Sequence, residues 1–395
     1  MSEWKKCPIG EVVTLRQGFA INAKSKHYMS KEETSLPLLR IADMKNGTKE
    51  VFVKEEIPQR FIAHPEDIIY TRTGNVGLVF RNNYGVMHNN CFSVTPNDAD
   101  ELSRDFLYYA LQNKTFFDTA NALARGAAQP DLPHTSFNSI EFAYPSLFVQ
   151  ERIATILSRY DSLIENYQKQ IKLLEEAARR LYKEWFIDLR FPGHENTKIV
   201  DGLPEGWERK KVNSIIELQS GFAFKSSTFD DNGAYKIVTI KNVKDGAFDG
   251  DNVSRIVAIP EKMPKHCVLA DGDILLSLTG NVGRVCIVNG KNYLLNQRVA
   301  KLATDYKAFA YCLFRSRDMF IEVNNLANGA AQQNVSPIRI GEMKILLPNN
   351  ELLQEFESIA RKSIARIISL QSQLRLLAEA RDRLLPKLMS GEITV

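Results

Sequence analysis

The chain has 395 residues, of which 44% are apolar and 25% are charged, as is typical of a globular protein with two or three domains, each able to bury its own core. The start lacks a secretory apolar segment and no run approaches the ~18 apolar residues of a membrane span, so we expect a cytoplasmic protein without a membrane partner. The net charge of +4 permits nucleic-acid binding but does not indicate it, because a strongly basic domain is the usual footprint.

The first 147 residues mix short β-type runs with Asn-Gly and Gly-Asn turns. Strands are predicted over residues 36–41, 67–70 and 76–80, and a short helix over residues 102–113. This mixture indicates an α+β domain. Residues 207 to about 347 show the same pattern.

A long helix is predicted after each of these two domains. In both helices apolar residues recur alternately every four and three positions, which is the 3.5-residue stripe of a coiled coil. Ser363 and Arg381 are polar interruptions of the second stripe. The predicted seam residues are Ile153, Leu157, Tyr160, Ile164, Tyr167, Ile171, Leu174, Leu181, Phe356, Ile367, Leu370, Leu374, Leu377 and Leu384.

An amphipathic helix usually packs on the core of its own domain, and that interpretation applies here as well. The span from Ile153 to Trp185 is, however, roughly 48 Å at ~1.5 Å per residue, longer than a small domain is wide. We therefore predict that the two helices pair, and that they run antiparallel because each starts at its own domain. The predicted fold class is α+β, with two pseudo-repeated mixed α/β domains separated by an antiparallel two-helix coiled coil of pseudo-two-fold symmetry.

The two halves repeat each other about 203 residues apart. A period this long indicates a duplicated domain plus helix rather than a solenoid unit, and it suits a target with two similar half-sites. The matching segments are Trp4 and Trp207, Gly18-Phe19 and Gly221-Phe222, residues 67–77 and 273–283, residues 126–129 and 329–332, and Pro145 and Pro348.

The Thr-Gly-Asn-Val-Gly turns at residues 73–77 and 279–283 are not Walker A loops, because no Lys-Ser/Thr follows. A tight turn that needs positive φ explains their glycines. Arg72 and Arg284 beside the turns could reach a phosphate or a guanine edge, and the asparagine in each turn could pair with adenine.

The loops at residues 125–129 and 328–334 combine small residues with amides, as a flexible connection or a close approach to DNA would require. Lysines and amides near predicted strand ends complete the set, although scattered lysines are usually solvated surface. The candidate DNA-binding residues are Lys24, Arg40, Arg72, Asn75, Asn89, Arg125, Gln129, Lys225, Lys241, Asn281, Arg284, Gln297, Asn328 and Gln332.

Searches for catalytic chemistry find no motif. The chain has no Asn-Pro-Pro-Tyr or Asp-Pro-Pro-Tyr methyltransferase motif, no G-x-x-x-x-G-K-[ST] and no H-E-x-x-H. The five scattered cysteines and six histidines lack metal-ligand or disulfide spacing, so we expect reduced thiols and no metal site. The pattern favours a binding protein over a catalyst.

The order of these motifs, taken twice, resembles the specificity subunit of type I restriction–modification systems over essentially the whole chain. The resemblance is carried by the two tryptophans and the paired turns, and by Leu-Asn-Gln-Arg-Val-Ala at residues 295–300. The entries to the helices contribute too, with Gln-Glu-Arg-Ile-Ala at residues 150–154 and Gln-Glu at residues 354–355. The ending at residues 384–393, Leu-Leu-Pro-Lys-Leu-Met-Ser-Gly-Glu-Ile, also matches.

The resemblance implies two target-recognition domains, residues 1–147 and 207–347, that each read one half of a bipartite DNA sequence. It implies two spacer helices, in residues 148–189 and, with the C-terminal tail, in residues 348–395. A linker over residues 190–206 would return the chain from the first helix to the second domain.

The resemblance also implies partners and cofactors. The helices would dock two adenine-N6 methyltransferase subunits that carry S-adenosylmethionine, and a restriction/translocase subunit would bring ATP and magnesium. This chain itself would bind double-stranded DNA, hold no cofactor and have no catalytic residue. Two other classes stay open: a coiled-coil adaptor that binds proteins, and a diverged self-contained DNA-modifying enzyme.

Overall fold

The computed structural model describes residues 4–251, 253–327 and 333–395. The chain divides into two compact units, unit 1 with residues 1–163 and 377–395 and unit 2 with residues 164–376. Each unit holds one α+β module together with part of both long helices. Within the described ranges, no helix is both long and apolar enough to cross a membrane.

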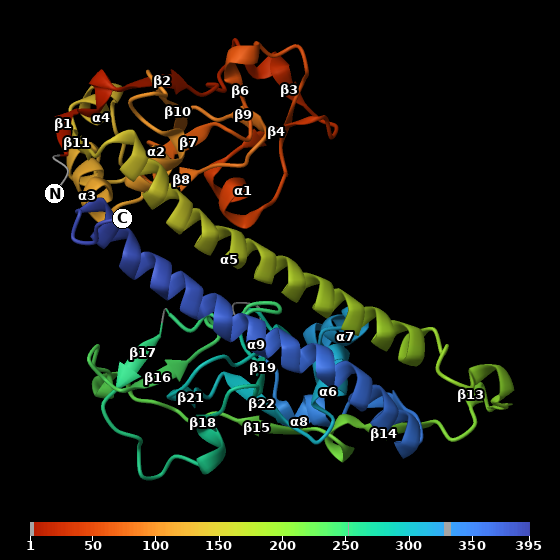
Figure 1. Ribbon diagram of the computed structural model, residues 1–395. Coiled ribbons are helices and arrows are strands. Elements are labelled where there is room, and N and C mark those ends of the chain that lie inside the picture. The colour runs from red at the N-terminus through yellow and green to blue at the C-terminus, as the bar shows by residue number, and fades with distance from the viewer. Residues whose placement is uncertain (1–3, 252, 328–332) are drawn as a thin grey trace. The chain divides into compact units, whose positions relative to one another are not determined.

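Module 1, residues 4–146, is built on two sheets (Figure 1). The first is antiparallel with strand order β2-β10-β7-β8, and the second has the order β3-β5-β4-β9-β6, in which β4 and β9 run parallel. The strands are β1 Lys5–Pro8, β2 Val13–Gln17, β3 Met29–Ser30, β4 Leu36–Leu39, β5 Phe52–Val53, β6 Ile62–Ala63, β7 Ile68–Thr71, β8 Val79–Phe80, β9 Gly85–Met87, β10 Cys91–Pro96 and β11 Glu141–Tyr144. The helices are α1 Ile41–Asn46, α2 Arg104–Ala110, α3 Lys114–Leu123 and α4 His134–Asn138.

The core of module 1 joins the first sheet to helices α2, α3 and α4. Tyr70 on β7 stacks on Phe92 of β10 with ring centroids 5.4 Å apart, and Phe137 of α4 meets the Phe92 ring edge-on at 5.0 Å. All three aromatic residues are buried. Period-2 alternation along the strands therefore directs one face of the sheet onto the helices.

The predicted strand over residues 36–41 is wrong at its end. It stops at Leu39, because Arg40 turns the chain into α1 and its guanidinium bonds the carboxylate of Asp43 one turn later. The predicted strand over residues 76–80 is also too long. Only β8 pairs, because the Gly77 N–H donates to the Thr71 carbonyl at 3.0 Å and keeps the preceding residues in a turn.

Module 2, residues 207–349, repeats this plan with its strands in corresponding order, except that its described residues contain no counterpart of β3. Its first sheet is β15-β22-β19-β20, and its second is β17-β16-β21-β18 with β16 and β21 parallel. The strands are β14 Glu208–Lys211, β15 Glu217–Ser220, β16 Tyr235–Val238, β17 Ser254–Ile256, β18 Val268–Leu269, β19 Ile274–Ser277, β20 Val285–Ile287, β21 Tyr293–Leu295, β22 Val299–Ala303 and β23 Lys344–Leu347. The helices are α6 Lys307–Phe314, α7 Arg317–Leu326 and α8 Pro337–Gly341.

Each module closes on itself through its first and last strands. β1 pairs with β11 in module 1, and β14 pairs with β23 in module 2. The corresponding strand orders of the two modules confirm the duplication predicted from the sequence. Between them, in the predicted linker, β12 Ile199–Val200 and β13 Leu203–Pro204 form a small hairpin.

The first long helix is α5, Leu147–Tyr182, which continues into a π-helical turn over Lys183–Ile187. The second is α9, Asn350–Met389. In unit 1, Ile153 and Leu157 near the start of α5 share a core with Leu388 near the end of α9. Opposite ends of the two helices thus meet in this unit.

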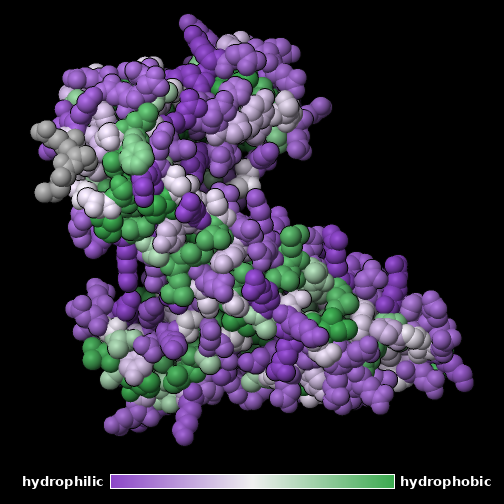
Figure 2. All heavy atoms as spheres, viewed as in Figure 1, coloured by the Kyte–Doolittle hydropathy of each residue, from purple (hydrophilic) through white to green (hydrophobic). Residues whose placement is uncertain are grey.

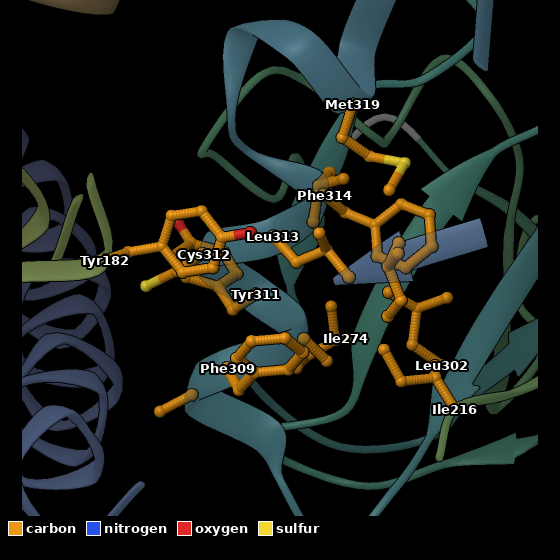
Figure 3. Close-up of a cluster of buried hydrophobic side chains, with 14 of the residues drawn as sticks. Tyr182, Ile216, Ile274, Leu302, Phe309, Tyr311, Cys312, Leu313, Phe314 and Met319 are labelled. Atoms are coloured by element: carbon orange, nitrogen blue, oxygen red, sulfur yellow. The ribbon is translucent and has the colours of Figure 1, made fainter. Parts of the chain in front are cut away.

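The reverse combination occurs in unit 2. Ala178 and Tyr182 near the end of α5 share a core with Phe356 and Ala360 near the start of α9. Figure 3 shows the Tyr182 ring lying against Cys312 of α6, deep in the core of module 2. The helices are therefore antiparallel, as predicted, and each also packs on a module core, so the two interpretations of the stripes hold together.

Every predicted seam residue is buried or half-buried. The polar interruption at Arg381 has a partner, because its guanidinium donates to the Asp161 carboxylate of α5 at 2.9 Å in unit 1. Asp161 also accepts from the Tyr109 hydroxyl of α2 at 2.6 Å, so one carboxylate ties both long helices to module 1. A partly buried polar cluster of this kind helps to fix the register of a helix pair.

Candidate nucleic-acid interface

The turn between β7 and β8 is held against α3 in module 1. Gly74 and Gly77 have φ values of +82° and +95°, so the backbone itself requires both glycines. A side chain at Gly77 would also strike the ring of Phe117 on α3. Asn75 lies exposed in the middle of the turn.

The turn between β19 and β20 repeats this frame in module 2. Gly280 and Gly283 have φ values of +72° and +84°, and a side chain at Gly283 would press on the ring of Phe320 on α7. Asn281 is exposed like its counterpart Asn75. The turn glycines therefore serve the fold, and the asparagine is the residue each turn presents to solvent.

The small-residue loop lies beside the turn in module 1, although the two motifs are about 50 residues apart in the sequence. The Gly74 N–H donates to the Pro130 carbonyl at 2.7 Å, and the Thr73 hydroxyl donates to the Asp131 carboxylate at 2.6 Å. These bonds bring Gln129, which is exposed, next to the turn.

Module 2 brings the corresponding segments together in the same way. The Gly280 N–H donates to the Gln333 carbonyl at 2.9 Å, and the Thr279 hydroxyl donates to the Asn334 side chain at 2.8 Å. Gln333 and Asn334, which directly follow the loop motif of module 2, therefore bond its turn as Pro130 and Asp131 bond the turn of module 1.

A hollow of about 600 Å³ lies beside the turn of module 1. Three of the predicted DNA-binding residues, Arg40, Asn75 and Gln129, line it together. The structure adds polar residues that the prediction did not include. The full lining is Arg40, Ile41, Ala42, Lys45, Asn46, Thr73, Gly74, Asn75, His88, Asn90 and Gln129.

Arg40 is held at this hollow by two carboxylates. Its guanidinium lies 2.5 Å from Asp43 and 2.6 Å from Glu50. Hydrogen bonds to Asp43 and then Glu50 raise the pKa of Arg40, and the same bond from Arg40 lowers the pKa of Asp43. The positive charge is thus locally balanced by acids of the same module.

A smaller hollow of about 340 Å³ occupies the corresponding place in module 2. It is lined by Thr279, Gln297, Arg298 and Asn334, of which Gln297 is a predicted DNA-binding residue. Gln297 and Arg298 are both exposed. None of the four lining residues is acidic, so the guanidinium gives this hollow a positive character.

Arg72, another predicted contact, is engaged inside module 1. Its guanidinium lies 2.6 Å from the Asp131 carboxylate and 3.3 Å from the Gln17 side-chain oxygen. Burial alone would raise the pKa of Asp131, but hydrogen bonds from Arg72 and Thr73 outweigh it and the pKa lies below its ordinary value. Arg72 therefore braces the small-residue loop against the sheet.

Arg284 is not the structural counterpart of Arg72. The Arg72 N–H donates to the Asn90 carbonyl at 2.8 Å, and the residue with the matching bond in module 2 is Leu278, whose N–H donates to the Arg298 carbonyl at 3.0 Å. Arg284 lies on the other side of its turn, where its N–H donates to the Ser277 hydroxyl at 3.0 Å.

The remaining predicted residues lie outside the hollows. Lys24, Lys225, Lys241 and Arg125 are exposed on loops. Asn89 is half-buried, and its carbonyl accepts from the Gln17 side chain at 2.7 Å. The predicted contacts Asn328 and Gln332 lie outside the described residues.

His88 and Arg298 are among the lining residues that the sequence reasoning did not select as DNA contacts. The Asn90 N–H donates to His88 Nδ1 at 3.2 Å, and in module 2 the Arg298 N–H donates to Asn296 Oδ1 at 3.4 Å. His88 thus corresponds to Asn296, and Asn90 to Arg298. The sequence carries a signal for this, because aligning the strands before these residues pairs Met87 with Leu295.

Among the described residues, no group of three or more His, Cys, Asp and Glu side chains is arranged to hold a metal ion. All five cysteines are free thiols, and four of them are buried.

Two copies of one module, each with a polar hollow at the same place, define a protein with a duplicated α+β module on one chain. The chain belongs to the family described as the type I restriction modification DNA specificity domain, which matches residues 1–176 and again residues 204–373. Together with the relatives below, this match makes it a specificity subunit of a type I restriction–modification system.

Two relatives come from Methanocaldococcus jannaschii. The type I restriction enzyme MjaVIII specificity subunit is 28% identical and aligns with 100% of this chain and 93% of its own length. The MjaIX specificity subunit is 29% identical over 77% of this chain and 72% of its own. The S subunit of the M. genitalium type I system shares the fold, with a TM-score of 0.63, 18% identity and coverage of 98% and 96%.

Proposed function

We propose that each module reads one half of a bipartite DNA target through the hollow beside its turn, and that this chain contributes no catalytic residue of its own. The observation that carries the proposal is the pair of hollows, formed by equivalent turns and loops in two modules of corresponding strand order. Hydroxyl, amide and guanidinium groups line both, and these are the side chains that read base edges and phosphates.

The two helices serve, in this proposal, as the spacer between half-sites. α5 has 36 residues, which at about 1.5 Å per residue gives roughly 54 Å of continuous helix. Two modules on one face of B-DNA need about 34 Å between centres for half-sites one turn apart. The length of helix is sufficient for that separation.

The same helices offer surfaces for partner subunits. Exposed apolar side chains occur on the helical part of each unit: Phe148 and Leu163 in unit 1, and Leu173, Ile359 and Leu376 in unit 2. Figure 2 shows apolar side chains along the helices on the visible face. We propose that they dock two adenine-N6 methyltransferase subunits carrying S-adenosylmethionine, with ATP and magnesium on a restriction/translocase subunit.

Mapping of methylated adenines after co-expression with the cognate methyltransferase subunits tests this function. The expected result is one asymmetric motif in which two specified half-sites flank an unspecified gap. A chain with module 2 exchanged for that of a relative should change only one half-site. Methylation at a single continuous motif, or none in the presence of active partners, would contradict the proposal.

The spacer role has a separate test. Removing one heptad from both helices at facing positions should shorten the unspecified gap by ~10 Å, or ~3 bp, without changing either half-site. A matched control replaces the same seven residues in each helix by another heptad of equal pattern and should leave the gap unchanged. An unaltered gap in the shortened chain would reject the spacer role.

A further inference from the structure

The two modules differ in the position of an arginine near the turn. In module 1, Arg72 directly follows strand β7, which leads into the turn, and Asn90 directly precedes the neighbouring strand β10. Module 2 has Leu278 and Arg298 at these places, as the matching backbone bonds of Arg72 to Asn90 and of Leu278 to Arg298 show. The arginine therefore lies at the end of one strand in module 1 and at the end of the neighbouring strand in module 2.

The surroundings of the two arginines are opposite in character. The Arg72 side chain is 21% exposed and lies against the Asp131 carboxylate. In module 2 Leu278 is buried, and the acid is replaced by Asn334, which accepts a bond from Thr279. Arg298 is exposed at the hollow that these residues line.

A second cation also lies on neighbouring strands in the two modules, and it can be compared with the arginine. In module 1, Arg16 on β2 pairs with Asp67 at 2.6 Å. In module 2 the cation is Lys301 on β22, 3.6 Å from Asp273. Arg16 lies opposite Ser93 in the register of β2 and β10, and Lys301 lies opposite Gln219 in the register of β22 and β15.

The acid of this ion pair is an aspartate at the same place in both modules. Asp67 accepts a backbone N–H bond from His64, and Asp273 accepts one from Ala270, each at 2.9 Å. In this ion pair the cation lies on different strands in the two modules, but the aspartate is the same. The change from Arg72 to Arg298 does not keep the acid, because Asp131 becomes Asn334. The structural role of the arginine has therefore been lost in module 2, while the arginine itself remains.

We propose that Arg298 makes the principal charge-assisted DNA contact of module 2, and that Arg72 is a structural brace that does not contact DNA. The ligand chemistry is a pair of acceptor atoms, on a guanine edge or on a phosphate, which a guanidinium binds with two parallel hydrogen bonds. Module 1 would instead read its half-site with the amides of Asn75, Asn90 and Gln129 and with His88. This inference rests on the proposed function.

The test uses the purified complex of this chain with its methyltransferase subunits and compares R298N, which installs the residue of module 1, with R298K. For R298N we expect at least a tenfold loss of methylation rate at targets with the wild-type module 2 half-site, and an unchanged module 1 half-site. A guanine contact predicts relaxed specificity at one position in both variants. A phosphate contact predicts a uniform loss in R298N, with a shallower salt dependence, and retention in R298K.

The double variant R72L/D131N, which installs the residues of module 2, serves as the matched control and should keep the module 1 motif. The inference is overturned if folded R298N keeps the module 2 motif and rate, or if folded R72L/D131N loses the module 1 motif. Failure of the proposed function is distinct, because the wild-type complex would then produce no bipartite motif at all.

Discussion

Modules 1 and 2 share a frame but differ in how they handle charge. Gly18 and Gly221, for example, occupy equivalent positions. In module 1 the next residue, Phe19, donates its N–H to the Met87 carbonyl at 2.6 Å, and in module 2 Phe222 donates its N–H to the Leu295 carbonyl at 2.9 Å. The residues around the hollows are different. The frame therefore tolerates changes of the residues that line the hollows.

Another charged pair of module 1 is a neutral pair in module 2. Arg40 and Asp43 of module 1 correspond to Thr239 and Asn242, whose side chains share a hydrogen bond of 2.9 Å. Both Asp43 and Asn242 are buried. An acid and an amide of equal shape can hold the same turn, but only the acid needs a cation.

The largest expected effect tests the shared frame. A side chain at Gly18 or Gly221 would overlap the backbone carbonyl of His88 or Asn296, which cannot rotate away. G18A and G221A should each destabilise their own unit by about 3 kcal/mol. Hydrogen exchange at increasing denaturant concentration measures the free energy of unfolding of each unit. G47A is the control for steric overlap: its side chain meets open space, and the φ of +68° should give only a smaller loss from backbone strain. A large loss in only one of the two modules would show that the frames are not equivalent.

Acidic residues of α5 provide the next contrast. Asp161 accepts from Tyr109 and Arg381, and Glu175 accepts from Tyr311 at 2.9 Å. D161N should cost unit 1 about 2–3 kcal/mol, because it weakens several bonds to one partly buried carboxylate. E175Q should cost unit 2 less, about 1–2 kcal/mol, because its cation Arg315 keeps a bond to Asp245. Equal losses in thermal unfolding of the two variants would contradict this ranking.

The sequence was sufficient for the duplication, the α+β class and the antiparallel helices. These rest on patterns that extend over many residues, such as the 3.5-residue stripe and the motifs that recur in one order. Local boundaries were less accurate. Arg40 continues an apolar run in the sequence, but its bond to Asp43 starts a helix, and only the fold shows that pair.

The site was predicted in part for a similar reason. Turn and loop motifs could be recognised, and the structure brings them together, but the state of each side chain depends on partners far along the chain. The sequence does not show that Arg72 is paired with Asp131, 59 residues later, and its role as a DNA contact stays a prediction. Residues 296–298 match Asn89 and Asn90 in the sequence, but only the backbone bonds of the fold pair Arg298 with Asn90.

Exchanging the acid and the amide should separate the two roles of arginine. D131N leaves Arg72 without its anion and should cost unit 1 about 1 kcal/mol, since the pair is partly exposed. N334D places a carboxylate in the hollow of Arg298 and should lower the methylation rate at the module 2 half-site about tenfold. If N334D instead left methylation intact while reducing stability, Asn334 would be a framework residue only.

The smallest expected effect concerns pH and the exchange of His88 for Asn296. Burial, and then the charge of Arg40, lower the pKa of His88 below its ordinary value, so the folded state binds this proton less readily than the unfolded state. The resulting stability is present above the unfolded pKa and is lost as the pH falls from there through the lowered, folded pKa.

H88N should therefore reduce the acid sensitivity of unit 1, because an asparagine oxygen accepts the same backbone bond in module 2 without titrating. His134 retains its own contribution, since burial lowers its pKa as well, so the sensitivity should decrease but not disappear. Hydrogen exchange of β10 amides between pH 7.5 and pH 5 measures the difference, and equal slopes in the two proteins would remove His88 from the linkage.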